Sequence, residues 1–294
     1  MTAAVAADTR PRLWLVDKPA GPTSHDVVAR VRRALPRRTK VGHTGTLDPF
    51  ATGLMVVLSG RATRLAPLMS GLDKRYRAVV RTGWTSATGD PEGPLERAGA
   101  PAGGAAVAGV LPRFRGTIEQ RVPDYAAVKV DGERLYARAR RGERVEAPTR
   151  AVTIHALELV ADRGDGRLEL EVHCSAGTYI RALAADIGAA VGCGAYCEEL
   201  RRTHVGELSV ADALPPEDAV AAGGRDPLEG LAHVPALEVG AAARAEVAHG
   251  RPLAGGARGR VLLVHEGELV AVAEGDGARI RPRVVLAAAG SGGE

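Results

Sequence analysis

The stretch GHTGTLDPFATGLMVVLSGRATR, from Gly42 to Arg64, constrains the fold of this chain more than any other. Its first half is dense in glycine and proline, which is typical of a loop. Its second half contains Leu54–Leu58, an apolar run of strand length. We therefore predict a polar loop supported by a buried strand, an arrangement that presents a reactive side chain on a rigid base.

Asp48 is the ionisable carboxylate of this loop, because the nearest acids in the sequence are Asp26 and Asp73. An Asp-Pro pair is also an ordinary turn initiator, so a purely structural role for Asp48 is the alternative at this point. A phosphate-binding loop of the Walker type is excluded, since no Gly-Lys-Ser/Thr tripeptide follows the glycines.

Length and cysteine content limit the class of protein. The chain has 294 residues, enough for two domains and a substantial core. Three cysteines, Cys174, Cys193 and Cys197, argue against a disulfide framework, and their spacing does not match a structural zinc site. No apolar run reaches the about 18 residues that span a bilayer, and the N-terminus lacks the pattern of a signal peptide. These features favour a cytoplasmic protein that does not span a membrane.

Basic residues gather in three runs, although the formal net charge is only +4. These runs are Arg30–Lys40, Lys74–Arg81 and Arg134–Arg150. One such run is more often a solvated face, but three near one candidate site indicate a nucleic-acid binder. Of the 39 basic residues, only Lys18, Lys40, Lys74 and Lys129 are lysines.

Hydrophobic periodicity and turn residues predict the elements of the first 220 residues. We predict strands at Leu13–Val16, Leu54–Leu58, Tyr76–Trp84, Val152–Val160, Arg167–His173 and Glu198–Val210. We predict helices from Thr23 or Ser24 to Leu35, at Thr63–Met69, at Ala105–Phe114, and from a Thr178 cap to Ala190. Asp90–Gly104 is rich in glycine and proline and predicts a flexible surface connection.

Two further segments are distinctive. Glu119–Arg150 is strongly charged and contains Tyr125 and Tyr136, which predicts a mobile insertion that orders on binding. The composition of residues 221–235 predicts a linker between a unit at 1–220 and a unit at 236–294. In the second unit we predict strands at Gly259–Val264, Leu269–Ala273 and Arg283–Ala287.

Six blocks, in order over about residues 12–215, resemble the bacterial tRNA pseudouridine-55 synthases of the TruB type. They are DKPAGPTSHDVVARVRR, VGHTGTLDPFATGLMVVLSGRATR, KRYRAVVRTGWTSATGD, KVDGERLYARARRGE, SAGTYIRALAADIG and LRRTHVGELSV. Residues 241–287 resemble the short PUA-like domain that ends part of this family. The resemblance implies an α+β fold: a mixed, mainly antiparallel sheet in the catalytic unit, with a basic RNA-binding insertion at about 119–150, followed by a small β-rich PUA-like domain.

The resemblance also implies a reaction. A uridine in the T loop of tRNA is isomerised: the glycosidic bond breaks, the base rotates while held, and carbon 5 joins the ribose. No metal and no organic cofactor is implied. The target base leaves the RNA stack at a cost of a few kcal/mol.

Site residues are assigned by the same resemblance. Asp48 matches the catalytic carboxylate, Arg181 its cationic partner, and Tyr76 the residue that stacks on the flipped base. The substrate-binding residues that it implies are His43, Tyr179, Leu200, Lys18 and Lys129. Asp48 either attacks the ribose carbon, attacks carbon 6 of the base, or removes a ribose proton, and each route needs an ionised carboxylate.

The predicted partner is the T stem-loop of tRNA, without an obligate protein partner and with a monomeric chain. One alternative is a non-catalytic RNA-binding protein, such as a tRNA-folding chaperone. The other is a pseudouridine synthase that acts on another RNA site.

Overall fold

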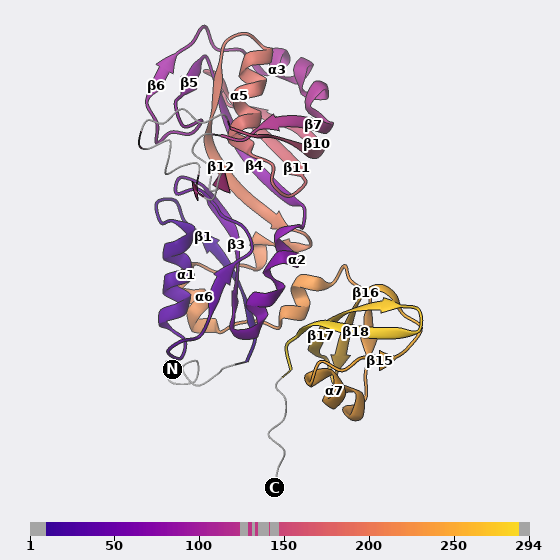
Figure 1. The fold of residues 1–294 in the computed structure, drawn as a ribbon. Helices are drawn as coiled ribbons and strands as arrows, with labels where there is room; N and C mark the ends of the chain where they lie inside the picture. Colours follow the sequence, from indigo (N-terminus) through magenta and orange to yellow (C-terminus); the bar gives the residue numbers. More distant parts are fainter. Residues whose placement is uncertain (1–9, 124–128, 131–132, 135–140, 142–146, 288–294) are drawn as a thin grey trace.

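The computed structural model describes residues 10–123, 129–130, 133–134, 141 and 147–287 (Figure 1). The extreme N-terminus and most of the predicted insertion Glu119–Arg150, including Tyr125 and Tyr136, therefore lie outside the described residues. Lys129 is described by its backbone alone. No helix within these ranges is long and apolar enough to cross a membrane.

The first unit is built on a sheet whose described strands number nine, in the order β1-β3-β12-β4-β11-β10-β7. β2 pairs with β3, and β13 pairs with β12. The strands are β1 (Arg12–Lys18), β2 (Val41–His43), β3 (Thr52–Ser59), β4 (Lys74–Thr82), β7 (Gly116–Arg121), β10 (Thr149–Asp162), β11 (Arg167–Cys174), β12 (Ala195–Val205) and β13 (Leu208–Ser209). Their pairing is antiparallel apart from a short parallel contact of β3 with β12. The predicted α+β class with a mainly antiparallel sheet is confirmed.

Helices and hairpins surround this sheet. They are α1 (Ser24–Arg33), η2 (Gly60–Leu65), α2 (Ala66–Ser70), α3 (Gly104–Val110), η3 (Leu111–Phe114), α5 (Ile180–Ala190), η4 (Val210–Asp212), α6 (Pro216–Ala222), η5 (Pro227–Leu231), and the pairs β5 (Trp84–Ser86) with β6 (Leu95–Arg97) and β8 (Lys129–Val130) with β9 (Glu133–Arg134). Thr23 caps α1, as predicted, and exchanges hydrogen bonds with Asp26.

The predicted Thr178 cap of α5 is wrong. Tyr179 is the N-cap residue, and the Thr178 hydroxyl donates instead to the Ser175 carbonyl. The Gln120 side chain, from β7, accepts from the Tyr179 backbone N–H and donates to its carbonyl. A residue distant in the sequence therefore provides hydrogen-bond partners for the backbone at the start of α5. A local sequence pattern cannot predict such a partner.

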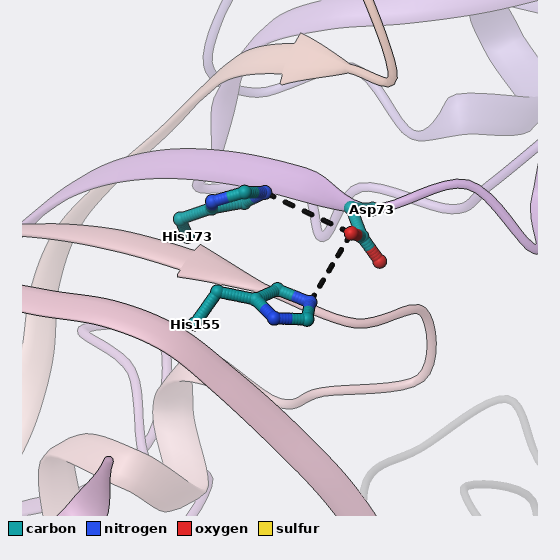
Figure 2. A group of neighbouring side chains, drawn as sticks. All are labelled: Asp73, His155 and His173. Carbon is teal, nitrogen blue, oxygen red and sulfur yellow. Dashed lines mark ion pairs between the residues drawn. The ribbon is translucent and has the colours of Figure 1, made fainter. Parts of the chain in front are cut away.

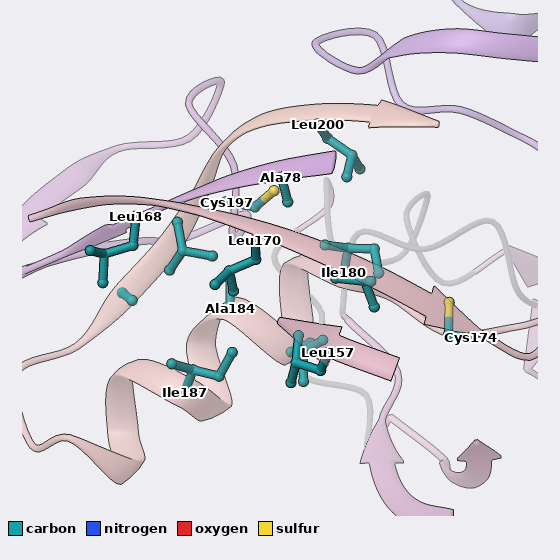
Figure 3. Close-up of a cluster of buried hydrophobic side chains, with 14 of the residues drawn as sticks. Ala78, Leu157, Leu168, Leu170, Cys174, Ile180, Ala184, Ile187, Cys197 and Leu200 are labelled. Atoms are coloured by element: carbon teal, nitrogen blue, oxygen red, sulfur yellow. The ribbon is translucent and has the colours of Figure 1, made fainter. Parts of the chain in front are cut away.

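The main core lies between α5 and one face of the sheet (Figure 3). Side chains alternate along β11, so Leu168, Leu170 and Val172 point into this core while their neighbours face the other side. Helix α5 contributes the predicted residues Ile180, Leu183, Ala184 and Ile187. The opposite face of β4 and β11 stays polar, as is common in antiparallel sheets.

Strands β1 and β3 are buried on both faces. Trp14 and Val16 pack with α1, whereas Leu13 and Leu15 pack in a second cluster on the other face. Both strands are therefore continuous apolar runs rather than alternating ones. This double burial makes β3 the rigid support that the sequence predicts for the polar loop.

The C-terminal unit contains β14 (Ala236–Glu238), α7 (Ala241–Ala248), β15 (Leu253–Ala254), β16 (Arg258–His265), β17 (Glu268–Asp276) and β18 (Arg279–Val285). The predicted strand Arg283–Ala287 is misplaced, because β18 starts earlier and includes Pro282. Pro282 lies at a shift in the register of β17 with β18, an irregularity that tolerates proline within a strand.

Candidate active site

A pocket of about 360 Å³ opens where the loop before β3 meets the start of α5. Its walls come from the loop, α2, β4, α5 and β12. The lining residues are Thr44, Gly45, Thr46, Leu47, Asp48, Ser70, Lys74, Tyr76, Gly177, Thr178, Tyr179, Ile180, Arg181, Leu200 and Arg202. Five predicted site residues are among them, namely Asp48, Tyr76, Tyr179, Arg181 and Leu200.

The loop backbone is fixed on both sides of Asp48. Before it, the Ser24 hydroxyl donates to the Leu47 carbonyl and accepts from the Leu47 N–H, both at 2.8 Å. After it, the ammonium group of Lys18 donates to the Pro49 carbonyl at 3.1 Å. Asp48 therefore lies on a tethered segment, which limits the positions that its carboxylate can reach.

Arg202 holds the same loop from below. It is 2% exposed, and its guanidinium donates to the carbonyls of Gly45, Thr46 and Leu54. This one buried guanidinium therefore joins the loop to β3. Its N–H donors are held in a rigid plane, so it can donate to several carbonyl oxygens at once.

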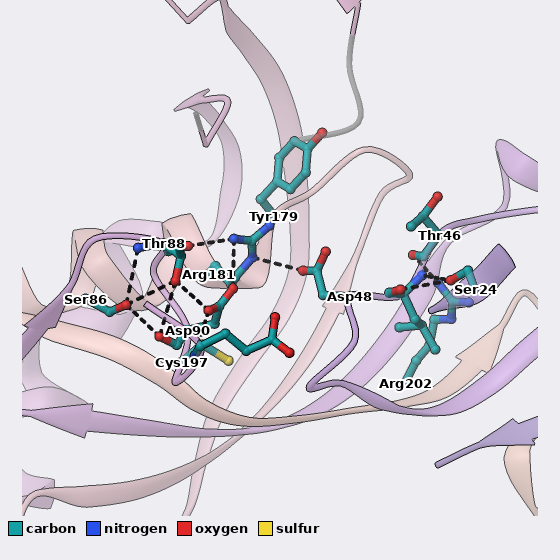
Figure 4. Close-up of polar contacts among 12 residues, drawn as sticks. Ser24, Thr46, Asp48, Ser86, Thr88, Asp90, Tyr179, Arg181, Cys197 and Arg202 are labelled. Carbon is teal, nitrogen blue, oxygen red and sulfur yellow. Dashed lines mark hydrogen bonds and ion pairs between the residues drawn. The ribbon is translucent and has the colours of Figure 1, made fainter. Parts of the chain in front are cut away.

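Arg181 connects two carboxylates (Figure 4). Its Nε lies 2.9 Å from Asp48 Oδ2, and its Nη1 lies 3.0 Å from Asp90 Oδ2. Asp90 is nearly inaccessible, with 5% of its side chain exposed, whereas Asp48 keeps 34% exposed toward the pocket. The Arg181 Nη1 also donates to the Thr88 carbonyl at 2.6 Å, and the Thr88 hydroxyl donates to Asp90.

These neighbours set the charge balance of Asp48. Burial raises the pKa of Asp48, the Arg181 cation opposes this, and the Asp90 carboxylate raises the pKa further. The net effect is a raised pKa of Asp48. Arg181 therefore does not fully offset the effect of burial on this pKa, because its guanidinium also pairs with a second carboxylate, Asp90.

The sequence prediction for Asp90–Gly104 is wrong at its start. Asp90 is not in a flexible surface connection but is buried against Arg181, and β5 and β6 form a hairpin nearby. Glycine and proline content suggested an exposed segment. The burial of Asp90 depends on an ion pair with a residue far along the chain, which composition does not reveal.

Aromatic and apolar side chains form the rest of the pocket. Tyr76, on β4, is also packed against the main core, and burial raises the pKa of its phenol. Tyr179 lies next to Arg150, whose guanidinium carbon is 5.0 Å from the ring centroid. Leu200, on β12, is 8% exposed. The faces of a flat ring can be enclosed by such walls.

Three predicted residues lie elsewhere. The ring of His43 is outside the pocket lining, and its Nδ1 accepts from the Gly45 N–H at 3.2 Å. Lys18 is fully buried below the loop, where burial lowers its pKa to about 8. The side chain of Lys129 lies outside the described residues. Contact of these three residues with a substrate stays a prediction.

Sequence reasoning missed Asp90 and Arg202, and it singled out Lys74 only as a retained lysine in the block that contains Tyr76. Asp90 and Arg202 both lie inside the blocks that carry the resemblance, which is a signal that could have drawn attention to them. Lys74 lines the pocket, and burial lowers its pKa to about 8.

Residues 32–180 match the domain described as TruB family pseudouridylate synthase (N terminal domain). Residues 181–222 match the tRNA pseudouridylate synthase B C-terminal domain. The chain is 43% identical to the tRNA pseudouridine synthase B of Synechococcus sp. (strain WH7803), over 94% of this chain and 97% of that protein. It is also 43% identical to the tRNA pseudouridine synthase B of Azoarcus sp. (strain BH72), over 93% and 94%.

Two solved structures illustrate the similarity of the fold. A chain in the structure of an H/ACA RNP bound to a substrate RNA containing 2′-deoxyuridine is similar with a TM-score of 0.72. It is 24% identical, and the likeness covers 95% of this chain and 86% of that chain. A chain of the archaeal box H/ACA sRNP Nop10-Cbf5 complex is similar with a TM-score of 0.70, at 24% identity and over 95% and 86%. At this identity the likeness concerns the fold.

Proposed function

Because the chain belongs to the TruB family of pseudouridylate synthases, we propose that it converts one uridine of tRNA to pseudouridine. The relatives that support this substrate are named tRNA pseudouridine synthase B and match over nearly the whole length of both chains. We assign the reaction to position 55 in the T loop, which is the position implied by the resemblance of the six sequence blocks.

One observation carries the proposal. Asp48 is partly exposed in a pocket, and its carboxylate is oriented by Arg181, which is itself held by the buried carboxylate of Asp90. Simple RNA binding does not require a carboxylate at such a place, because a negative charge repels phosphates. A tethered, ionised carboxylate is what each route for breaking the glycosidic bond requires. The non-catalytic alternative is therefore not favoured.

The reaction balances without an external oxidant or reductant. The bond between N1 of uracil and the ribose carbon breaks, and a bond from that ribose carbon to C5 of the same base forms. C5 loses its hydrogen as a proton, and N1 gains a proton. Asp48 attacks the ribose carbon, attacks C6 of the base, or removes a ribose proton.

The pocket walls suit a base that has left its stack. Tyr76 offers a ring face, and aromatic stacking returns about 1–3 kcal/mol per base. This offsets the few kcal/mol that flipping costs. Leu200 and Tyr179 enclose the remaining sides, so that the detached base turns over without leaving the pocket.

We extend the proposal to the parts outside the pocket. The basic insertion at about 119–150 and the C-terminal unit at 236–294 bind the body of the tRNA, with His43, Lys18 and Lys129 assisting at the loop. The chain acts as a monomer in the cytoplasm, without an obligate protein partner.

The proposal is tested with an unmodified tRNA transcript that carries tritium at C5 of its uridines. The expected result is release of one tritium per tRNA into water, because C5 must lose its hydrogen. A transcript with cytidine in place of the T-loop uridine should release none. Tight binding of the RNA without tritium release would contradict the proposed reaction.

A further inference from the structure

A second cluster of chemically active side chains lies on the polar face of the sheet, away from α5 (Figure 2). It consists of Asp73, in the turn before β4, His155, in β10, and His173, in β11. Together they offer one carboxylate and two imidazoles. The sequence gives no metal-binding spacing for them, because they lie far apart along the chain.

The position of His155 depends on an irregularity in β10. The register of β10 with β11 shifts between Ile154 and Ala156. His155 and Ala156 therefore both lie opposite the single residue His173. Ile154 and Leu157 both stay in the core, and His155 points outward. Bulges of this kind re-aim side chains and are frequent beside functional sites.

The ligand atoms are close enough to surround one ion. His155 Nε2 lies 3.1 Å from Asp73 Oδ2, and His173 Nε2 lies 3.8 Å from the same oxygen. All three ligand atoms lie within 4.8 Å of one another. Zinc bonds nitrogen and oxygen at about 2.0–2.2 Å, which places neighbouring ligands in a tetrahedron about 3.3 Å apart. We propose that Asp73, His155 and His173 bind a divalent transition-metal ion of the zinc class, with water completing its coordination.

Charge and protonation favour this ligand set. The carboxylate of Asp73 supplies a negative charge, and neutral imidazole is the form that binds metal. All three side chains are partly exposed, which leaves a path for an ion to enter.

The proposed ion stabilises the fold rather than taking part in the reaction. It joins three segments that meet only in the folded sheet, so it binds the native chain in preference to the unfolded one. Asp73 also immediately precedes Lys74, which lines the pocket. The ion therefore fixes the start of the strand that carries Tyr76.

The first test measures Zn²⁺ binding to the full chain after treatment with a chelator, by competition with a chromogenic indicator. We expect one Zn²⁺ per chain and a rise of the thermal midpoint. His155→Gln and Asp73→Asn should each weaken binding at least about tenfold and remove that rise. His233→Gln is the matched control, since His233 is exposed and outside the cluster, and it should bind as the unaltered chain does. Equal Zn²⁺ affinity in His155→Gln and His233→Gln would overturn the proposal.

A second measurement uses the unaltered chain and does not depend on whether a variant folds. Diethylpyrocarbonate modification of each histidine is followed by peptide mass spectrometry, with and without Zn²⁺. We expect Zn²⁺ to slow the modification of His155 and His173 at least about tenfold, and to leave His233 unchanged. Equal rates with and without Zn²⁺ at His155 and His173 would overturn the proposal.

Discussion

At the scale of single residues, the shared guanidinium of Arg181 determines how Asp48 behaves. Two carboxylates and one cation leave the group with a net negative charge, and Asp90 contributes to the raised pKa of Asp48. Asp90 acts through Arg181, so it is a positioning residue. Arg181 without the Asp90 charge would keep its attraction for Asp48 and its hydrogen bond to the Thr88 carbonyl, but it would lose the ion pair that holds Nη1.

Asp90→Asn tests this division of roles. Removing the Asp90 charge lowers the pKa of Asp48, so the acidic limb of the rate profile should move to lower pH. The plateau rate should fall about 10- to 100-fold, because Arg181 and Asp48 are less well positioned. The measurement is the single-turnover rate against pH at saturating tRNA. Asp165→Asn, at an exposed ion pair, is the control, and a limb that moves to higher pH would contradict the account.

Tyr76 is the second residue whose role can be isolated. Tyr76→Leu should slow turnover by about 5- to 150-fold, which corresponds to the 1–3 kcal/mol that stacking on one base contributes. Tyr76→Phe keeps the ring and should retain most of the rate. Single-turnover rates on the same tRNA separate the two substitutions. If Tyr76→Leu reacted at the unaltered rate, the base would not stack on Tyr76.

The sequence predicted these residues unequally. Asp48, Arg181 and Tyr76 came from the resemblance of their blocks, and the structure brings them to one pocket. Asp90 was not predicted, since its burial follows from an ion pair across the fold. Arg202 was not predicted either, because an arginine in a strand gives no local sign of binding three distant carbonyls.

At the scale of elements, the loop before β3 depends on close contact with β12. Gly53 has a φ of +102°, and a Cβ added there would lie 2.2 Å from the Arg202 carbonyl oxygen. Both facts require glycine at this position. The loop is therefore held by a backbone contact as well as by the side chain of Arg202.

Gly53→Ala should lower the free energy of unfolding by at least about 2 kcal/mol, because the added methyl group forces β3 and β12 apart. Gly42→Ala is a matched control in the same stretch, where an added Cβ meets no atom within 4 Å. It should change stability by less than about 0.5 kcal/mol. Urea unfolding of both variants makes the comparison, and equal midpoints would contradict this view of the loop.

Elements with a clear period were predictable, and elements defined by distant partners were not. The alternation in β11 and the capped amphipathic pattern of α1 are local features, and both elements were predicted. The start of β18 and the cap of α5 depend on a register shift and on Gln120. Neither feature produces a hydrophobic periodicity that can be recognised in the sequence.

At the scale of the whole molecule, the two units share a hydrophobic cluster. Leu262 and Leu269 of the C-terminal unit belong to the same cluster as Leu13 and Leu65 of the first unit. The intervening segment also packs closely, since Arg225 exchanges backbone hydrogen bonds with Leu13. The division at residues 221–235 stays a prediction, but the described contacts make the two units depend on each other.

Removal of residues 236–294 should therefore destabilise the remaining chain. The loss exposes apolar side chains around Leu13 and Leu65, and we expect the thermal midpoint to fall by about 5 °C or more. Calorimetry of the full and shortened chains measures this, with binding of a hydrophobic dye as a second readout. An unchanged midpoint would mean that the shared cluster adds nothing to the stability of the first unit.

The central claim is that Asp48, held by Arg181, carries out the isomerisation of a T-loop uridine. The most direct measurement maps pseudouridine by position in an unmodified tRNA transcript after saturating incubation with the unaltered chain or with Asp48→Asn. We expect product at one T-loop uridine with the unaltered chain, and none with Asp48→Asn although that variant binds tRNA within several-fold of normal affinity. Appreciable product from Asp48→Asn, or product from neither chain, would contradict it.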